Sequence, residues 1–115
     1  MRMNLVVIRT EHPSELKRQY EVLGLTFKYH QHGNGPMHFA SDFEGLVFEI
    51  YPLTKSMNKP DNSLRIGFEV NDLEQIMNGV RNSDWIIRSE ISNTEWGLIA
   101  VIQDFDGRKV ELKNK

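Results

Sequence analysis

The sequence predicts an α+β fold built from two consecutive βαβββ modules, and an internal repeat is the main reason. Asp42-Phe43-Glu44-Gly45 returns 62 positions later as Asp104-Phe105-Asp106-Gly107, and an apolar and acidic strand pattern ending in Glu-Ile or Glu-Leu follows each copy. Upstream, residues 5–8 and 65–68 each begin a strand that leads into a helix, at an offset of 60. Because the same elements surround both copies in the same order, we predict a tandem duplication.

The residue pattern of the first half of the chain predicts a strand, a helix and three further strands. Pro13 is tolerated in a first helical turn. Leu16, Tyr20 and Leu23 then form one apolar stripe, and Gly24 is suited to ending the helix. The turn motif, with Gly45 at a position that favours positive φ, predicts a hairpin between the last two strands. The strands are expected at residues 4–10, 25–32, 37–41 and 46–51.

The second half follows the same plan. Asp72 and Gln75 resemble a capping box at the start of a helix, whose apolar stripe runs to Val80. The strands are expected at residues 64–70, 85–89, 98–103 and 108–113. We therefore predict a single domain over residues 1–115, with module 1 at 1–52, a polar linker at 53–62 and module 2 at 63–115. The expected core comprises Val6, Ile8, Leu16, Tyr20, Leu23, Phe48, Ile50, Ile66, Phe68, Leu73, Ile76, Val80, Val110 and Leu112.

Composition excludes several classes of function. The chain has 115 residues, a net charge of -2 and no cysteine. It therefore lacks disulfides and thiolate ligands, and no bulk positive charge would recruit nucleic acid or a membrane. The N-terminal apolar run is too short for a signal peptide. The absence of cysteine fits a reducing setting, so we expect a cytoplasmic protein.

Local motifs point to a known superfamily. Tyr20–Leu25 is similar to its aromatic-x-x-Leu-Gly-Phe helix ending, and Phe48–Pro52 to the end of its first module. Thr94–Gly97 and Asp104–Leu112 are similar to its second module. The chain thus resembles the vicinal oxygen chelate superfamily, which contains glyoxalases, bleomycin-resistance proteins and extradiol dioxygenases. The resemblance implies a cupped mixed sheet with the helices on its convex face, a pocket formed by two half-cups, and a homodimer.

The resemblance also gives an expectation about metals. Metal enzymes of this superfamily carry one ligand on the first strand and one on the last strand of each module. The last-strand positions hold Glu49 and Glu111, but the first-strand positions hold Leu5 (or Asn4) and Arg65. Leucine has no donor atom, and a guanidinium cannot donate a lone pair to a cation. We therefore expect no bound metal and no cofactor.

The candidate ligand-binding residues are Glu49, Arg65, Glu111, His38, Tyr51 and Trp96. Strand alternation places Glu49 and Tyr51 opposite Phe48 and Ile50, and therefore on the face away from the helix. The charged trio of Glu49, Arg65 and Glu111 is compatible with a structural salt-bridge cluster or with a pocket floor. His38 reaches the same face if the hairpin has a suitable register.

Other polar residues have simpler interpretations. Asp104 and Asp106 are expected to form a turn, and His12 to be exposed. His30 and His32 share one strand face, where a solvated strand end is the simpler interpretation of the pair.

Three functions stay open. The first is a metal-independent binder of a small organic ligand. The second is a lyase, isomerase or dioxygenase-like enzyme of the same superfamily. It would be either metal-independent, with Glu49 or Glu111 as the base and His38 or Arg65 as the polarising group, or metal-dependent. The third is an interaction module. Fold kinship alone does not choose among them.

Overall fold

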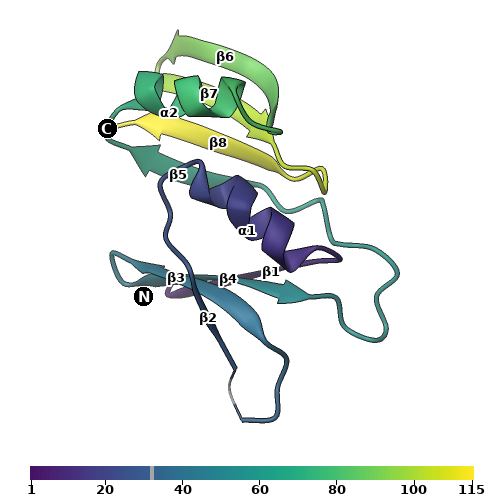
Figure 1. The fold of residues 1–115 in the computed structure, drawn as a ribbon. Helices are drawn as coiled ribbons and strands as arrows, with labels where there is room; N and C mark the ends of the chain where they lie inside the picture. The colour runs from purple at the N-terminus through teal and green to yellow at the C-terminus, as the bar shows by residue number, and fades with distance from the viewer. Residues whose placement is uncertain (32) are drawn as a thin grey trace. The chain divides into compact units, whose positions relative to one another are not determined.

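The computed structural model describes residues 1–31 and 33–115, with the side chain of His30 also left undescribed. The chain divides into two compact units, residues 1–61 and 62–115. The boundary falls inside the predicted linker. Each unit contains one helix and one four-stranded mixed sheet, so the fold is α+β with two βαβββ modules (Figure 1).

The first unit has the predicted order of elements. They are β1 (Leu5–Thr10), α1 (Pro13–Glu21), β2 (Lys28–His30), β3 (His38–Phe43) and β4 (Leu46–Pro52). The sheet order is β1-β4-β3-β2, with β1 parallel to β4 and the other pairs antiparallel. A helix between β1 and its parallel neighbour provides the long crossover that parallel strands require.

One face of this sheet is covered by α1. The helix begins at Pro13 and packs against β1, β3 and β4. Its stripe residues Leu16 and Tyr20 are fully buried with Phe48 and Ile50, and the Tyr20 and Phe48 rings lie 5.4 Å apart. Strand alternation sends the neighbouring side chains of β4 to the opposite face, which α1 does not cover.

The second unit repeats the plan. It contains β5 (Ile66–Val70), α2 (Leu73–Arg81), β6 (Ile86–Thr94), β7 (Gly97–Gln103) and β8 (Lys109–Asn114), in the sheet order β5-β8-β7-β6. The carboxylate of Asp72 accepts a hydrogen bond from the Gln75 amide at 3.1 Å, which confirms the predicted helix start. Leu73, Met77 and Val80 bury the helix against its sheet.

The strand registers confirm the offsets of the repeat. Val7 pairs with Glu49 on parallel β1 and β4, and Gly67 pairs with Glu111 on parallel β5 and β8. Equivalent residues of the first strands, β1 and β5, are thus 60 positions apart in the sequence. Equivalent residues of the last strands, β4 and β8, are 62 positions apart. Leu5 and Arg65 therefore occupy equivalent positions in the two modules.

The repeated turn motif adopts two different conformations. In the first unit Phe43 pairs with Leu46, so only Glu44 and Gly45 connect the strands, and both have positive φ (51° and 82°). In the second unit the Asp104 amide donates to the Arg108 carbonyl at 3.0 Å, which leaves a three-residue connection ending at Gly107. The same four-residue motif therefore forms a hairpin in both units, but it does not determine how many residues connect the strands.

Several element boundaries and core positions differ from the predictions. Strand β2 is only Lys28–His30, whereas β6 continues to Thr94 instead of ending at Ser89. As an edge strand, β6 pairs only with β7, and irregular pairing after Ile87 weakens its sequence alternation. Ten of the fourteen expected core residues are buried, and four are only half-buried. These four are Val6, Ile66, Phe68 and Ile76.

Within the described part of the chain, neither helix is long and apolar enough to cross a membrane.

Candidate functional site

The helix-free face of the first sheet carries a cluster of polar side chains. The parallel register places Val7 beside Glu49 and Arg9 beside Tyr51. On the other side of β4, Phe39 pairs with Ile50, so His38 lies beside Tyr51 on the same face as Glu49. We call Arg9, His38, Glu49 and Tyr51 the first-sheet cluster.

The central contact of this cluster is between His38 and Glu49. The imidazole Nε2 lies 3.0 Å from the Glu49 carboxylate, and the two side chains are only 1% and 10% exposed. The Glu49 carboxylate accepts, so Nε2 is the donor of this hydrogen bond. The other ring nitrogen, Nδ1, lies 3.1 Å from the Pro36 carbonyl oxygen.

Tyr51 completes the cluster above the imidazole. Its ring stacks on His38 with centroids 4.1 Å apart and planes 7° apart, and its hydroxyl lies 3.4 Å from Nε2. The Arg9 guanidinium lies 4.8 Å from the Tyr51 ring centroid and donates to the Pro52 carbonyl at 3.0 Å. Burial raises the pKa of the Tyr51 hydroxyl, the charge of Glu49 raises this pKa further, and Arg9 opposes the shift. Tyr51 is thus a neutral hydroxyl at physiological pH.

Apolar side chains adjoin this cluster on the same face. Leu5 and Val7 alternate with Arg9 on β1, and they remain 51% and 37% exposed. Small-molecule sites usually combine accessible apolar surface with a few polar groups in fixed positions. The face is therefore chemically suited to an organic ligand that has both an apolar body and a polar group.

The helix-free face of the second sheet is charged in a different way. The Arg65 guanidinium lies 3.7 Å from the Glu111 carboxylate, and the two side chains are 56% and 40% exposed. A contact this exposed contributes little to stability. Of the charged trio named from the sequence, Arg65 and Glu111 thus form an ion pair, and both groups remain accessible to other partners.

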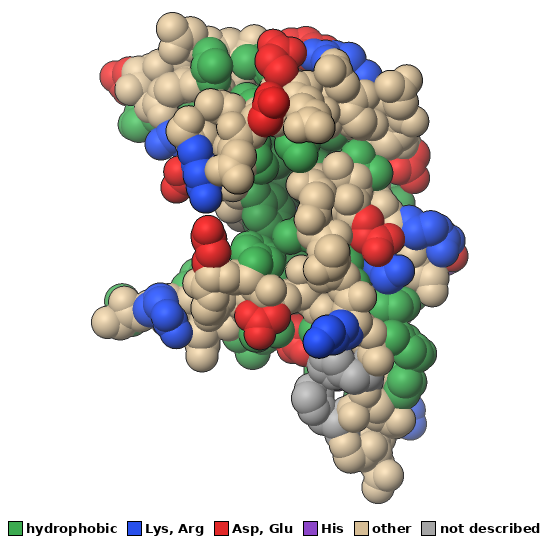
Figure 2. Space-filling model, turned by 60° about the vertical axis from the view of Figure 1, so that its left-hand side comes forward, with side chains coloured by type: hydrophobic (Ala, Val, Ile, Leu, Met, Phe, Trp, Pro, Cys, Tyr) green, Lys and Arg blue, Asp and Glu red, His purple; other side chains and the backbone are tan. Residues whose placement is uncertain are grey.

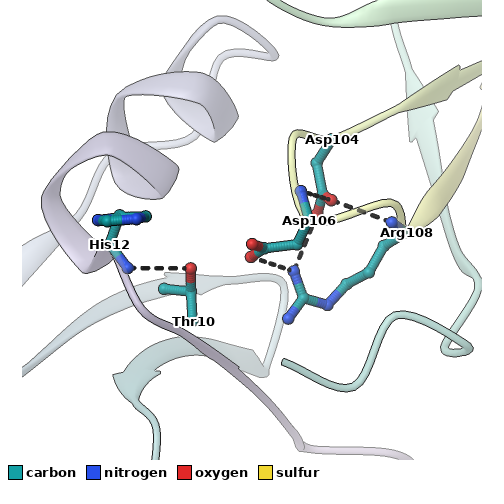
Figure 3. Close-up of polar contacts among 5 residues, drawn as sticks. All are labelled: Thr10, His12, Asp104, Asp106 and Arg108. Carbon is teal, nitrogen blue, oxygen red and sulfur yellow. Dashed lines mark hydrogen bonds and ion pairs between the residues drawn. The ribbon is translucent and has the colours of Figure 1, made fainter. Parts of the chain in front are cut away.

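The turn residues of the second unit have a structural role. Figure 3 shows Arg108 donating to both turn carboxylates, at 3.1 Å to Asp104 and 3.0 Å to Asp106. Asp104 also accepts from the backbone amides of Asp106 and Arg108 at 3.0 Å each. Because Asp104 and Arg108 are fully buried, these contacts hold the β7–β8 connection in place. This confirms the interpretation of Asp104 and Asp106 as turn residues.

The histidines other than His38 contribute nothing to these clusters. The backbone amide of His12 donates to Thr10 Oγ1 at 3.2 Å, as Figure 3 also shows. Its imidazole is 61% exposed and lies 3.6 Å from Glu15, which confirms the expected exposure. His32 and the side chain of His30 lie outside the described part of the structure.

The structure distributes the predicted site residues over three places. His38, Glu49 and Tyr51 lie together on the first sheet, and Arg65 and Glu111 lie together on the second. Trp96 is 66% exposed in the β6–β7 turn, where its backbone amide donates to Thr94 Oγ1.

Sequence reasoning missed Arg9 as a member of the first-sheet cluster. Arg9 follows Leu5 and Val7 at the same two-residue spacing, so period two could have found it. By the same alternation, Lys109 shares the face of Glu111 on β8.

The residues do not fit the metal centre that the fold resemblance implies. Among residues 1–31 and 33–115, no group of three or more His, Asp or Glu side chains is arranged to hold a metal ion. Glu49 is hydrogen-bonded by His38, and Glu111 faces the positive charge of Arg65. A zinc or iron site generally needs three or four donors. Of the two expected ligand positions in each module, only one holds a residue that can coordinate a metal. This residue is Glu49 in the first module and Glu111 in the second.

Charges elsewhere on the visible surface are mixed. Figure 2 shows Lys and Arg side chains interspersed with Asp and Glu over the face in view. That face carries no extended field of one sign of the kind that binds a nucleic-acid backbone.

Comparisons with known proteins identify the fold. The sequence matches no protein-family model and no curated protein. Among solved structures, the antibiotic-binding protein TnmS3 of a Streptomyces species superposes with a TM-score of 0.77 and 19% identity, covering 99% of this chain and 95% of that one. TioX of a Micromonospora species gives a TM-score of 0.74 and 16% identity over 97% of both chains.

A third neighbour is a Burkholderia phytofirmans member of the glyoxalase/bleomycin resistance protein/dioxygenase family. It gives a TM-score of 0.74 and 14% identity over 96% of both chains. Sequence identities this low support a shared fold but not a shared activity. The activity has to be inferred from the residues of the site. The chain has the fold of the glyoxalase/bleomycin-resistance proteins.

Proposed function

We propose that the protein binds a small organic molecule without a metal, and that the first-sheet cluster forms the polar part of the binding site. The observation that carries this proposal is the buried hydrogen bond between His38 and Glu49, stacked under Tyr51 on a sheet face without a helix. A buried, preorganised polar group of this kind can orient a ligand at small entropic cost.

The ligand that suits this face is amphipathic. Its polar group would accept from the Tyr51 hydroxyl or donate to the Glu49 carboxylate, and its apolar body would cover Leu5 and Val7. Because TnmS3 is an antibiotic-binding protein, antibiotics are the first ligands to test.

Isothermal titration calorimetry against bleomycin and a panel of antibiotics that combine an apolar body with a polar group tests the proposal. We expect saturable one-to-one binding by at least one compound. Glu49→Gln or Tyr51→Phe should weaken that binding by about tenfold, because each removes one hydrogen-bonding group that a charged or polar ligand uses. Glu69→Gln, which removes an exposed carboxylate of β5, is the control and should leave affinity unchanged. An affinity that is unchanged in both Glu49→Gln and Tyr51→Phe would contradict the placement of the site. The absence of binding by every compound in the panel would contradict the function.

A second candidate is a metal-independent enzyme of the same superfamily, and the buried contact of the His38 imidazole with the Glu49 carboxylate favours it. Such a pair can donate or accept a proton at a bound substrate. Mass spectrometry of a compound recovered after incubation with the protein separates the two candidates. An unchanged mass supports a binder, whereas a changed mass that requires His38 supports an enzyme.

We also propose a cytoplasmic homodimer. Each four-stranded sheet has two edge strands, and unpaired edges commonly associate with a second copy. Sedimentation equilibrium at micromolar concentration should give twice the chain mass of 13.4 kDa, and a single-chain mass would refute the dimer.

A further inference from the structure

A separate cavity lies at one end of the second sheet. It has a volume of about 320 Å³ and is lined by Asn62, Ser63, Leu64, Arg65, Gly107 and Lys109. These residues come from the segment before β5, from the β7–β8 connection and from the start of β8. All of them belong to the second unit, so this unit supplies the whole lining.

Positive charge dominates the wall of this cavity. Arg65 and Lys109 directly precede the paired residues Ile66 and Val110, so the two cations lie side by side on adjacent strands. Glu111, 3.7 Å from Arg65, neutralises one of these two charges. Lys109 forms no ion pair with any residue that the structure describes, which leaves the cavity wall with one uncompensated cation.

Asn62 adds a neutral hydrogen-bond donor to the wall. Over the described residues, its side-chain amide makes no hydrogen bond. The Asn62 Nδ2 atom lies over Gly107, where a Cβ atom would come within 3.2 Å of it. Because Gly107 has no side chain and adopts a φ of 98°, the amide has room at this place.

We propose that this cavity binds the carboxylate or phosphate group of a small organic anion. The guanidinium of Arg65 presents paired donors that match either group, Lys109 supplies a point charge, and Asn62 supplies a further N–H. A cavity of about 320 Å³ is at the small end of ligand pockets, which suits a compact anion. The proposal is independent of ligand binding at the first-sheet cluster, because the two sites share no residue.

Proton–nitrogen NMR correlation spectra provide a direct test. The side-chain amide of Asn62 and the backbone amide of Gly107 are followed while inorganic phosphate or succinate is added at constant ionic strength. We expect a saturable shift of both signals with at least one anion. Saturation with phosphate alone identifies a phosphate site, and saturation with succinate alone identifies a carboxylate site.

Charge variants establish whether the cavity is responsible. Lys109→Gln and Arg65→Gln should each raise the dissociation constant about tenfold, as expected for loss of one charge-assisted contact. Asn62→Asp, which is nearly isosteric but adds a negative charge, should abolish the saturable shift of Gly107. Lys113→Gln removes a cation from the same strand outside the cavity and should leave the dissociation constant unchanged. The proposal is overturned if neither anion gives a saturable shift, or if the cavity variants bind as well as Lys113→Gln.

Discussion

At the scale of single residues, burial distinguishes the contacts made by the two last-strand glutamates, Glu49 and Glu111. His38 and Glu49 are 1% and 10% exposed, whereas Arg65 and Glu111 are 56% and 40% exposed. Water screens the second pair, so its contribution to the free energy of unfolding is small. The first pair must be satisfied within the protein, because neither group can recover its hydrogen bonds from solvent.

Alanine substitution should therefore affect the two pairs differently. Glu49→Ala removes the partner of a buried imidazole and should lower the free energy of unfolding by about 1–3 kcal/mol. Glu111→Ala, the matched control, should change the same quantity by less than about 0.5 kcal/mol. Urea denaturation monitored by circular dichroism measures both, and equal effects would refute this difference between the pairs.

Tyr51 provides a prediction about high pH. Its pKa is raised from 10.0, first by burial and then by the charge of Glu49. A raised pKa means that the folded state favours the neutral hydroxyl. The stability from this preference is present below pH 10 and is lost as the pH rises through the higher folded-state value.

Ultraviolet titration of tyrosine ionisation tests this directly. The ionisation step that Tyr51→Phe removes should have its midpoint above pH 10. In Glu49→Gln this midpoint should move downward, because the negative charge that raises the pKa of Tyr51 is absent. A midpoint below pH 10, or no movement in Glu49→Gln, would contradict the assigned causes.

At the scale of elements, the two hairpins show how far a sequence motif determines local structure. Asp-Phe-acidic-Gly predicts a turn correctly in both modules, because the glycine suits positive φ in each. The motif does not determine the number of connecting residues. Arg108 makes the difference in the second unit, where it is buried with Asp104 and Asp106 and holds a longer connection. Such tertiary contacts are invisible to local patterns.

The short hairpin gives a prediction about stability. Glu44 has a φ of 51°, a conformation that costs ordinary residues about 1–2 kcal/mol. Two-residue hairpins favour Asn-Gly at these positions. Glu44→Asn should therefore raise the free energy of unfolding by about 0.5–1 kcal/mol. Urea denaturation checks the change, with Glu95→Asn in the β6–β7 turn as the control, since Glu95 lacks positive φ. A gain of similar size in the control would show that conformation at residue 44 is not the cause.

At the scale of the whole chain, the repeat predicted the βαβββ order of both modules, and the register equates Leu5 with Arg65 and Glu49 with Glu111. Period two also predicted that Glu49 faces away from the helix. The partner of Glu49 was harder to predict, because it depends on the hairpin register that brings His38 beside β4. Contacts such as the stacking of Tyr51 on His38 depend on side-chain packing that no spacing rule contains.

The equivalence of these positions leads to the prediction that the purified protein carries no stoichiometric divalent metal. Each module fills one of its two family ligand positions with glutamate, and the remaining positions are apolar Leu5 and cationic Arg65. The hydrogen bond from His38 would also have to break before Glu49 could bind a cation. Elemental analysis of protein purified without chelators should find zinc, manganese, nickel and iron far below one atom per chain. Arg65→His restores one donor and removes a positive charge, but it leaves Leu5 unable to coordinate. Added zinc should therefore raise the melting temperature of this variant little, if at all. Stoichiometric metal in the wild-type protein, lost in both Glu49→Ala and Glu111→Ala, would instead establish a metal centre and favour the enzymatic function over the binder.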